Sequence, residues 1–336
     1  MKKIKLLALT LSILLLLSLS LTACSEKDND EGIDNPGKSG EVNIAVLNGT
    51  TGFGIAKLME DAKNGNTDVT YNVTVETDAS VIQSALINGD IDIAALPTNA
   101  AAALYNKSEG GIKIVAVNTL GVLYLMTNGV EVTSINDLRG KTVYAPAQNP
   151  AFIFEAICRA NGLTPGEDIT IDTAYAQPAD LRAALVAGQV DIAVLPEPMV
   201  TIAKSANTDL TVSLDLTAEW EKVYGENSLM QGCIVVRTAW AEARPDELKK
   251  FLEDYEASVN YTVSNPKEAS ELIVSNNIFA GKAPVAEKAI PKCNIVYMDS
   301  GDNIAEYLNK FFTALFGVNP KAVGGSIPDS GIYYGK

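Results

Sequence analysis

The sequence contains two similar thirteen-residue segments that begin 99 residues apart. Residues 85–97 (ALINGDIDIAALP) align with residues 184–196 (ALVAGQVDIAVLP), and eight of the thirteen pairs are identical. Each copy combines the end of a helix, a glycine suited to cap it, a short apolar run too buried to alternate, and a proline that ends the run. Two copies 99 residues apart indicate a duplicated α/β unit. The alternative is that a common sequence pattern of helix, glycine and strand occurs twice by chance.

The rest of the chain alternates strand and helix patterns. We predict strands at residues 42–47, 70–76, 91–96, 112–120, 122–127, 143–145, 170–174, 190–195 and 233–237. Helices are expected at 53–63, 80–88, 98–105, 152–161, 179–187 and 198–205, and in most of the chain after 244. This alternation predicts an α/β protein with mixed, mainly parallel sheets and helices on both faces.

The first forty residues resemble an export signal followed by a tether. Lys2, Lys3 and Lys5 precede an aliphatic run, which ends in Leu-Thr-Ala-Cys at residues 21–24. This ending resembles the bacterial lipobox and predicts removal of residues 1–23 and lipidation of Cys24; the alternative is an uncleaved signal anchor. Residues 24–40 are polar and acidic and predict a flexible tether. We therefore expect a lipid-anchored protein on the extracytoplasmic face of the cell membrane.

The composition excludes several functions. Without the three signal lysines, 23 basic residues face 41 acidic ones, and this net charge of −18 argues against nucleic acid and against docking on anionic lipid. The absence of histidine removes serine and cysteine triads and histidine-bearing zinc sites. We predict no catalytic residues, no metal and no cofactor. Cys158, Cys233 and Cys293 form either one disulfide and a free thiol or three reduced, buried thiols.

Three phrases carry a family resemblance: DLRGKTVYAP at 137–146, ALVAGQVDIAVLPEPMV at 184–200 and GGSIPDSGIYY at 324–334. They resemble the substrate-binding proteins of nitrate, sulfonate, taurine and thiamine-pyrimidine importers (SsuA/THI5-like). The resemblance implies the type II periplasmic-binding-protein fold, a monomer of two lobes joined by two hinge strands. It further implies an ABC permease and ATPase as partners.

By the same analogy, lobe 1 comprises residues 41–132 and 238–336, and lobe 2 comprises residues 133–237. The hinges are expected near residues 129–133 and near Arg237. Hinge closure over one small molecule is the implied mechanism.

In open α/β sheets, ligands bind beyond the carboxyl ends of the strands, where helices begin. The residues at the predicted strand ends are therefore the candidate ligand-binding residues: Thr50, Thr51, Gly52, Phe53, Thr77, Asp78, Thr98, Asn99 and Tyr124 in lobe 1, and Gln148, Asn149, Phe152, Gln177 and Glu197 in lobe 2. Thr51 and Asn149 have helix capping as an alternative role. For Phe53 and Phe152, the alternative role is packing in the hydrophobic core.

Two ligand chemistries are consistent with these residues. Helix N-termini suit a sulfonate, nitrate or carboxylate. Aromatic residues such as Tyr124 and Tyr175 suit a flat heterocycle, for which Glu197 and Asp78 would accept hydrogen bonds from ring amino groups. We favour an organic ligand over a bare inorganic anion. Glu197 has the alternative of a salt bridge to an arginine, either Arg139 or Arg182.

Two other function classes remain open. The same fold includes the pyrimidine synthases of thiamine assembly, whose histidine and cysteine-rich motif this chain lacks. The second open class is a sensor or adhesion lipoprotein that has the same ligand-binding cleft but no associated transporter.

Overall fold

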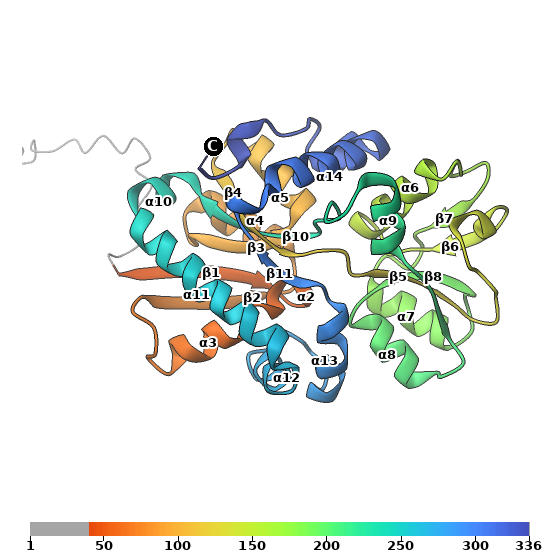
Figure 1. Cartoon of the computed structure of the whole chain (residues 1–336), viewed down its shortest axis with the longest axis horizontal. Helices are drawn as coiled ribbons and strands as arrows, with labels where there is room; N and C mark the ends of the chain where they lie inside the picture. The colour runs from red at the N-terminus through yellow and green to blue at the C-terminus, as the bar shows by residue number, and fades with distance from the viewer. Residues whose placement is uncertain (1–39, 336) are drawn as a thin grey trace, which may run out of the picture. The chain divides into compact units, whose positions relative to one another are not determined.

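The computed structural model describes residues 40–335 (Figure 1). Six strands form the first sheet, in the order β11-β4-β10-β3-β1-β2. Its strands are β1 (Glu41–Leu47), β2 (Thr70–Glu76), β3 (Ile93–Pro97), β4 (Ile112–Thr119), β10 (Gly232–Arg237) and β11 (Ile295–Met298). β1 pairs in parallel with β2 and β3, whereas β10 runs antiparallel to β3 and β4. The sheet is therefore mixed, with β10 reversed near its centre and β11, which runs antiparallel to β4, reversed at its edge.

Five strands form the second sheet, in the order β7-β6-β8-β5-β9. They are β5 (Leu123–Thr127), β6 (Thr142–Tyr144), β7 (Thr170–Asp172), β8 (Ile192–Pro196) and β9 (Thr211–Asp215). β6 pairs in parallel with β7 and β8, and β5 is antiparallel to β8 and β9. Both sheets thus share one topology, in which a reversed strand separates the third and fourth strands of the unit.

The repeat predicted from the sequence is a repeat of structure. Strand β8 has the bounds of β3 shifted by 99 residues, and β9 begins 99 residues after β4. The helices α4 (Ala79–Asn88) and α7 (Pro178–Val186), which precede the two repeated strands, also begin 99 residues apart. The offset therefore extends well beyond the thirteen residues in which the sequences agree, and this confirms the duplicated α/β unit.

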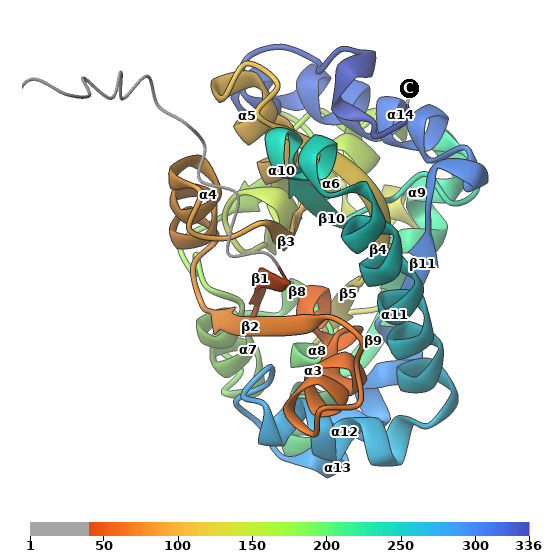
Figure 2. The same ribbon diagram turned by 90° about the vertical axis from the view of Figure 1, so that its left-hand side faces the viewer.

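Helices cover both faces of each sheet. In Figure 2, α5 and α14 lie on one side of the first sheet, and α3, α12 and α13 on the other. Besides α4 and α7, the helices are α2 (Thr50–Phe53), α3 (Ala56–Lys63), α5 (Thr98–Lys107), α6 (Asn149–Ala160), α8 (Met199–Ala206), α9 (Leu216–Tyr224), α10 (Thr238–Ala243), α11 (Pro245–Ser264), α12 (Pro266–Ser275), α13 (Ala283–Ala289) and α14 (Ile304–Val318).

Local chemistry sets the helix ends. The Asp78 carboxylate accepts a hydrogen bond from the amide of Ser80 and caps α4, which ends at Gly89 in the left-handed conformation. Asp215 caps α9 in the same way, with its carboxylate accepting from the amide of Thr217. Proline, whose fixed φ suits a first turn, begins α7, α11 and α12.

The buried strands place apolar side chains on both faces of the sheet. In β1, Val42, Ile44 and Val46 pack into a core on one face of the first sheet, and Ala45 packs into the core on the other face. The second of these cores continues into the second sheet, where Leu125 of β5 belongs to it. The apolar runs did not alternate in sequence because both faces of the sheet are covered.

The chain passes between the two sheets twice. Residues 120–122 lead from β4 into β5, and residues 225–231 lead from α9 into β10. Both passages come earlier than the predicted hinges, because each reversed strand pairs within the sheet that the chain is entering. The predicted lobe boundaries remain a prediction, and we propose to move them to these two passages.

Candidate functional site

The carboxyl ends of the strands in both sheets adjoin the two passages. Leu123, the first residue of β5, pairs with Pro196 at the end of β8. Gly232, the first residue of β10, pairs with Pro97 at the end of β3. Because each reversed strand starts beside the carboxyl end of its neighbour, the helix N-termini of both sheets lie around the same connection.

The strand orders arrange the predicted site residues in three tiers. Nearest the passages are Thr98, after β3, and Glu197, after β8. The next tier follows β1 and β6, at residues 50–53 and 148–152. The outer tier follows β2 and β7 and contains Asp78 and Gln177. Thr98 and Glu197 are related by the 99-residue offset, as are Asp78 and Gln177, so the two halves of the site are built from equivalent positions.

Four buried side-chain oxygens at these helix starts have no hydrogen-bond partner in the described part of the chain. They are Oγ1 of Thr98, Oδ1 of Asn99, Oδ1 of Asn149 and Oγ1 of Thr217. Thr98 and Asn99 begin α5, Asn149 begins α6, and Thr217 is the second residue of α9. A buried polar group without a partner costs about 1–3 kcal/mol, so a group of them at equivalent edges of both sheets requires an explanation.

The amide of Asn99 is oriented by its surroundings. Its Nδ2 donates to the carbonyl oxygen of Ala322 over 3.4 Å, which leaves Oδ1 as the free acceptor. The Thr98 hydroxyl lies beside the thiol of Cys233, a weak hydrogen-bonding group whose pKa burial raises to about 12. These two neighbouring residues therefore present acceptor oxygens whose capacity is unused.

Glu197 lies in the tier nearest the passages. Its side chain is fully buried, and its oxygens accept hydrogen bonds from the amide and the hydroxyl of Thr201, at 3.1 and 3.0 Å. Nζ of Lys292 lies 3.9 Å from Oε1 of Glu197. Burial raises the pKa of the Glu197 carboxyl, against the lowering effect of the Thr201 bonds and the lysine charge. The alternative of an arginine partner is not what the structure has: the cation near this carboxylate is Lys292, and Arg139 pairs with Asp168.

Tyr124 connects the two sheets at the same place. It lies in β5 of the second sheet, and its hydroxyl donates to the carbonyl oxygen of Lys292 over 3.2 Å. Lys292 belongs to a short 3₁₀ turn (Ile290–Lys292) between α13 and β11 of the first sheet. Burial and the nearby Asp215 and Glu197 carboxylates raise the pKa of Tyr124, so it remains a neutral donor.

The middle tier has a buried side and an accessible side. Phe53 is fully buried and packs edge-on against Phe279, 6.2 Å between ring centroids, so it presents no face to a ligand in this structure. Phe152 is half-buried against the core. The carbonyl oxygen of Thr51 accepts from Nδ2 of Asn118, a buried residue near the end of β4 that sequence reasoning missed.

The remaining members of this tier differ in burial. Thr50 is half-buried, whereas Gly52 is packed so closely that a side chain there would clash with the carbonyl oxygen of Leu47. Gln148 is exposed and has φ 66°, a conformation that favours glycine, directly before α6. Backbone strain of this kind is often found at functional sites.

The outer tier is exposed. Thr77, Asp78 and Gln177 are accessible to solvent, and Asp78 is used as the cap of α4. An aromatic pair lies beside it in the second sheet, where Tyr144 at the end of β6 meets Tyr175 with ring centroids 5.9 Å apart. The sequence predicts Tyr175 as an aromatic neighbour of a ligand, whereas it assigns Tyr144 only to a strand.

Structural roles account for other polar residues. Asp92 accepts hydrogen bonds from the amide of Asn43 and from Arg237, and the Asp92–Arg237 pair is almost completely buried. Cys158, Cys233 and Cys293 are free and buried. Among residues 40–335, no cluster of acidic and cysteine side chains is suited to a metal ion. None of the helices in this range has the length and apolarity that a membrane span requires. Cys24 and the predicted signal lie outside the described residues.

A groove of about 500 Å³ lies away from the strand ends, between α6, α9 and α14. Arg159, Tyr224 and Lys310 contribute to its lining. The arginine is paired with Glu155 and the lysine with Glu306, so both charges are already compensated. None of the predicted site residues lines this groove, and we assign the candidate site to the strand ends.

A profile of the NMT1/THI5-like family matches residues 68–269, more than half of the chain. The chain belongs to the NMT1/THI5-like family. No curated protein matches this member of the family. Among solved structures, an ABC transporter protein from Parabacteroides distasonis is 25% identical, with a TM-score of 0.73, over 88% of this chain and 99% of the other.

Two further structures share the fold of this family member. The periplasmic aliphatic sulphonate binding protein SsuA from Escherichia coli is 17% identical, with a TM-score of 0.70, over 88% of this chain and 96% of its own. A ligand-binding component of an ABC-type import system from Staphylococcus aureus, solved with zinc bound, is 16% identical, with a TM-score of 0.63, over 87% and 97%. These likenesses confirm the periplasmic-binding-protein fold expected from the sequence.

Proposed function

We propose that this protein is the extracytoplasmic solute-binding component of an ABC importer and traps a small organic molecule at the carboxyl ends of its two sheets. The family, the fold and the import-system relatives support the class of function. The permease and ATPase would be its partners, and residues 120–122 and 225–231 would be the hinges. Closure of one lobe on a ligand held by the other would follow from a higher affinity of the closed form.

The unpartnered oxygens of Thr98, Asn99, Asn149 and Thr217 are the observation that carries this proposal. A ligand with hydrogen-bond donors would satisfy them and recover part of the free energy that their burial costs. Two of the four lie on α5, which follows a strand of the first sheet, and two lie on helices that follow strands of the second sheet. One molecule that bonds to both groups would therefore favour the closed arrangement.

The groups around the site favour an organic ligand with donor groups over a bare inorganic anion. The positive charge of Lys292 is already opposed by Glu197, which reduces its attraction for an anion. Tyr144 and Tyr175 offer an aromatic pair at the outer end, suited to contact a flat ring. A sulfonate or carboxylate, suited to the helix N-termini, is the alternative ligand class, and the screen below distinguishes the two.

The same proposal places the protein at the cell membrane. We propose that residues 1–23 are a signal peptide, that Cys24 carries the lipid, and that residues 25–40 act as the tether. Mass spectrometry of the purified membrane form tests this directly. An N-terminal peptide beginning at acylated Cys24 supports the assignment, and an unmodified peptide that includes residues before Cys24 contradicts it.

A thermal-shift screen tests the binding function. The panel comprises sulfonates, nitrate, carboxylates, amino-pyrimidines, amino acids and vitamins. A true ligand at 100 times its Kd adds about 2.7 kcal/mol to the free energy of unfolding. The absence of any stabilising compound would favour a sensor or adhesion role.

A matched pair of variants then locates the site. Asn149→Ala removes an unpartnered amide at the start of α6, and we expect it to reduce the ligand-induced shift. Asn161→Ala, at the other end of the same helix, removes a side chain that donates to the carbonyl oxygen of Ile157, and we expect an unchanged ligand-induced shift. Equal effects of the two substitutions would place the ligand elsewhere.

A further inference from the structure

A continuous path of hydrogen bonds joins the two deepest site residues through the passages. The amide of Thr98 donates to the carbonyl oxygen of Gln231 over 3.0 Å. Oε1 of the same glutamine accepts from the amide of Val122 over 2.8 Å. The carbonyl oxygen of Val122 in turn accepts from the amide of Glu197 over 3.0 Å. The path runs from the start of α5 in the first sheet to the end of β8 in the second.

One link in this path is a side chain. Gln231 directly precedes β10 in the second passage, and Val122 directly precedes β5 in the first. The backbone of Gln231 is fixed to the first sheet, because its amide also donates to the carbonyl oxygen of Thr119 over 3.0 Å. Its side chain alone reaches Val122, so the Oε1 contact ties one passage to the other.

A second carboxamide, that of Asn294, also bonds to the first passage. Nδ2 of Asn294 donates to the carbonyl oxygen of Gly121, and the carbonyl oxygen of Asn294 accepts from the amide of Leu120. The backbone between β4 and β5 is therefore fixed by both Asn294 and Gln231. Asn294 precedes β11, so both fixing groups belong to chain segments of the first sheet.

We infer that Gln231 is a positioning residue that sets how the second sheet, with Glu197, is held relative to Thr98. Its side chain contacts the passage and not the unpartnered oxygens, so it acts through the placement of the two helix starts. Without the Oε1 acceptor, the amide of Val122 is left buried and unpaired in the observed arrangement. Arrangements in which that amide reaches water then gain population. This inference rests on the proposed closure of the lobes.

The expected size of this effect follows from the cost of an unpaired buried amide. A cost of about 1–3 kcal/mol corresponds to a population shift of about 5- to 140-fold at 1.4 kcal/mol per tenfold. Gln231→Met keeps the length of the side chain and removes the acceptor. Gln231→Glu keeps an acceptor at the same position. The two variants therefore differ in the one contact that the inference depends on.

Distances between spin labels on the two lobes measure the arrangement without any ligand. Ser84→Cys on α4 and Ala183→Cys on α7 place labels at exposed positions of equivalent helices, 99 residues apart. Cys24→Ser removes the predicted lipid site. The native thiols do not compete for label, because they are buried and their pKa values are raised, to about 12 for Cys158 and Cys233.

We expect Gln231→Met to broaden the distance distribution or to add a second population, and Gln231→Glu to match the parent chain. Gln189→Met, at an exposed glutamine after α7, is the control for the chemical change and should leave the distribution unchanged. If the methionine variant does not fold, Gln231→Ala replaces it. Coincident distributions for the parent chain and the acceptor-free variant would overturn the inference, as would equal shifts in the methionine and glutamate variants. The ligand screen is independent of this measurement, so failure of either one is recognised separately.

Discussion

Thr98→Val should make the ligand-free protein more stable and its binding weaker. Valine has the shape of threonine with a methyl group in place of the hydroxyl. Thr98 is fully buried, and its Oγ1 lacks a partner in the described chain. The substitution therefore removes a buried polar group that only the weak Cys233 thiol compensates in part, and the backbone bond from its amide to Gln231 is kept.

The structure sets the expected magnitudes. Burial of an unpartnered hydroxyl costs about 1–3 kcal/mol, and the neighbouring Cys233 thiol offsets part of it, so we expect a gain of about 1 kcal/mol in the free energy of unfolding. For a ligand that bonds to this hydroxyl, the substitution should weaken the binding free energy by about 0.5–1.5 kcal/mol. This corresponds to a rise in Kd of about 2- to 12-fold.

Urea unfolding and titration calorimetry measure the two effects on the same preparations, with the ligand that the screen identifies. Thr98→Ser is the matched control, because it keeps the hydroxyl and loses a buried methyl group. It should lose about 1 kcal/mol of stability and bind within about twofold of the parent. A valine variant that is destabilised by more than about 1 kcal/mol, or that binds as tightly as the parent, would refute the role assigned to this oxygen.

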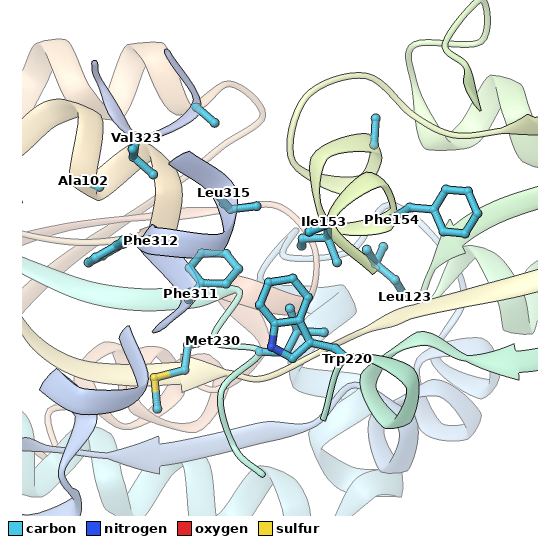
Figure 3. Packing of buried hydrophobic residues seen from close by; sticks show 14 of the residues in the cluster. Ala102, Leu123, Ile153, Phe154, Trp220, Met230, Phe311, Phe312, Leu315 and Val323 are labelled. Atoms are coloured by element: carbon cyan, nitrogen blue, oxygen red, sulfur yellow. The ribbon is translucent and has the colours of Figure 1, made fainter. Parts of the chain in front are cut away.

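Three further predictions concern charge and packing. The folded-state pKa of Glu197 lies above its ordinary value of 4.5. The free energy of unfolding should therefore rise as the pH falls through the folded pKa towards 4.5, and Glu197→Gln should lack this rise. A difference between parent and variant that does not vary from pH 8 to pH 4 would contradict it. Asp92→Asn removes the charge of a carboxylate that pairs with Arg237 in an almost completely buried contact, and urea unfolding should show a loss of about 3–5 kcal/mol; a loss below about 1 kcal/mol would refute the importance of the pair. Phe311→Ala removes a ring 5.8 Å from Trp220 (Figure 3), and we expect a loss of about 3–5 kcal/mol with a red shift of tryptophan emission. Unchanged emission would show that the cavity stays closed to water.

Much of the fold was predictable because the chain repeats and the buried strands are short apolar runs. The prediction was least complete between residues 206 and 231, where the structure has β9 and α9. β9 is an edge strand whose side chains are largely exposed, so it produced no apolar run. The boundaries between the lobes remain a prediction and are hard to place for another reason: β5 and β10 each pair in the sheet that the chain is entering, which order along the sequence does not reveal.

The sequence indicates where the candidate residues lie along the strands and helices, and it says less about their contacts. Strand ends identified Thr98, Asn149 and Glu197 because helices begin there. The sequence had no means to reveal that Glu197 lies near Lys292, almost a hundred residues away in the chain, or that Phe53 turns into the core. Such contacts depend on the packing of segments that are distant in sequence.

The central claim is that one small molecule bonds to both sheets at the carboxyl ends of their strands. A crystal structure with the ligand from the screen tests it most directly. We predict a single molecule within hydrogen-bond distance of Thr98 or Asn99 on the first sheet and of Asn149 or Thr217 on the second. A ligand bound to one sheet alone, or in the groove between α6, α9 and α14, would contradict the account.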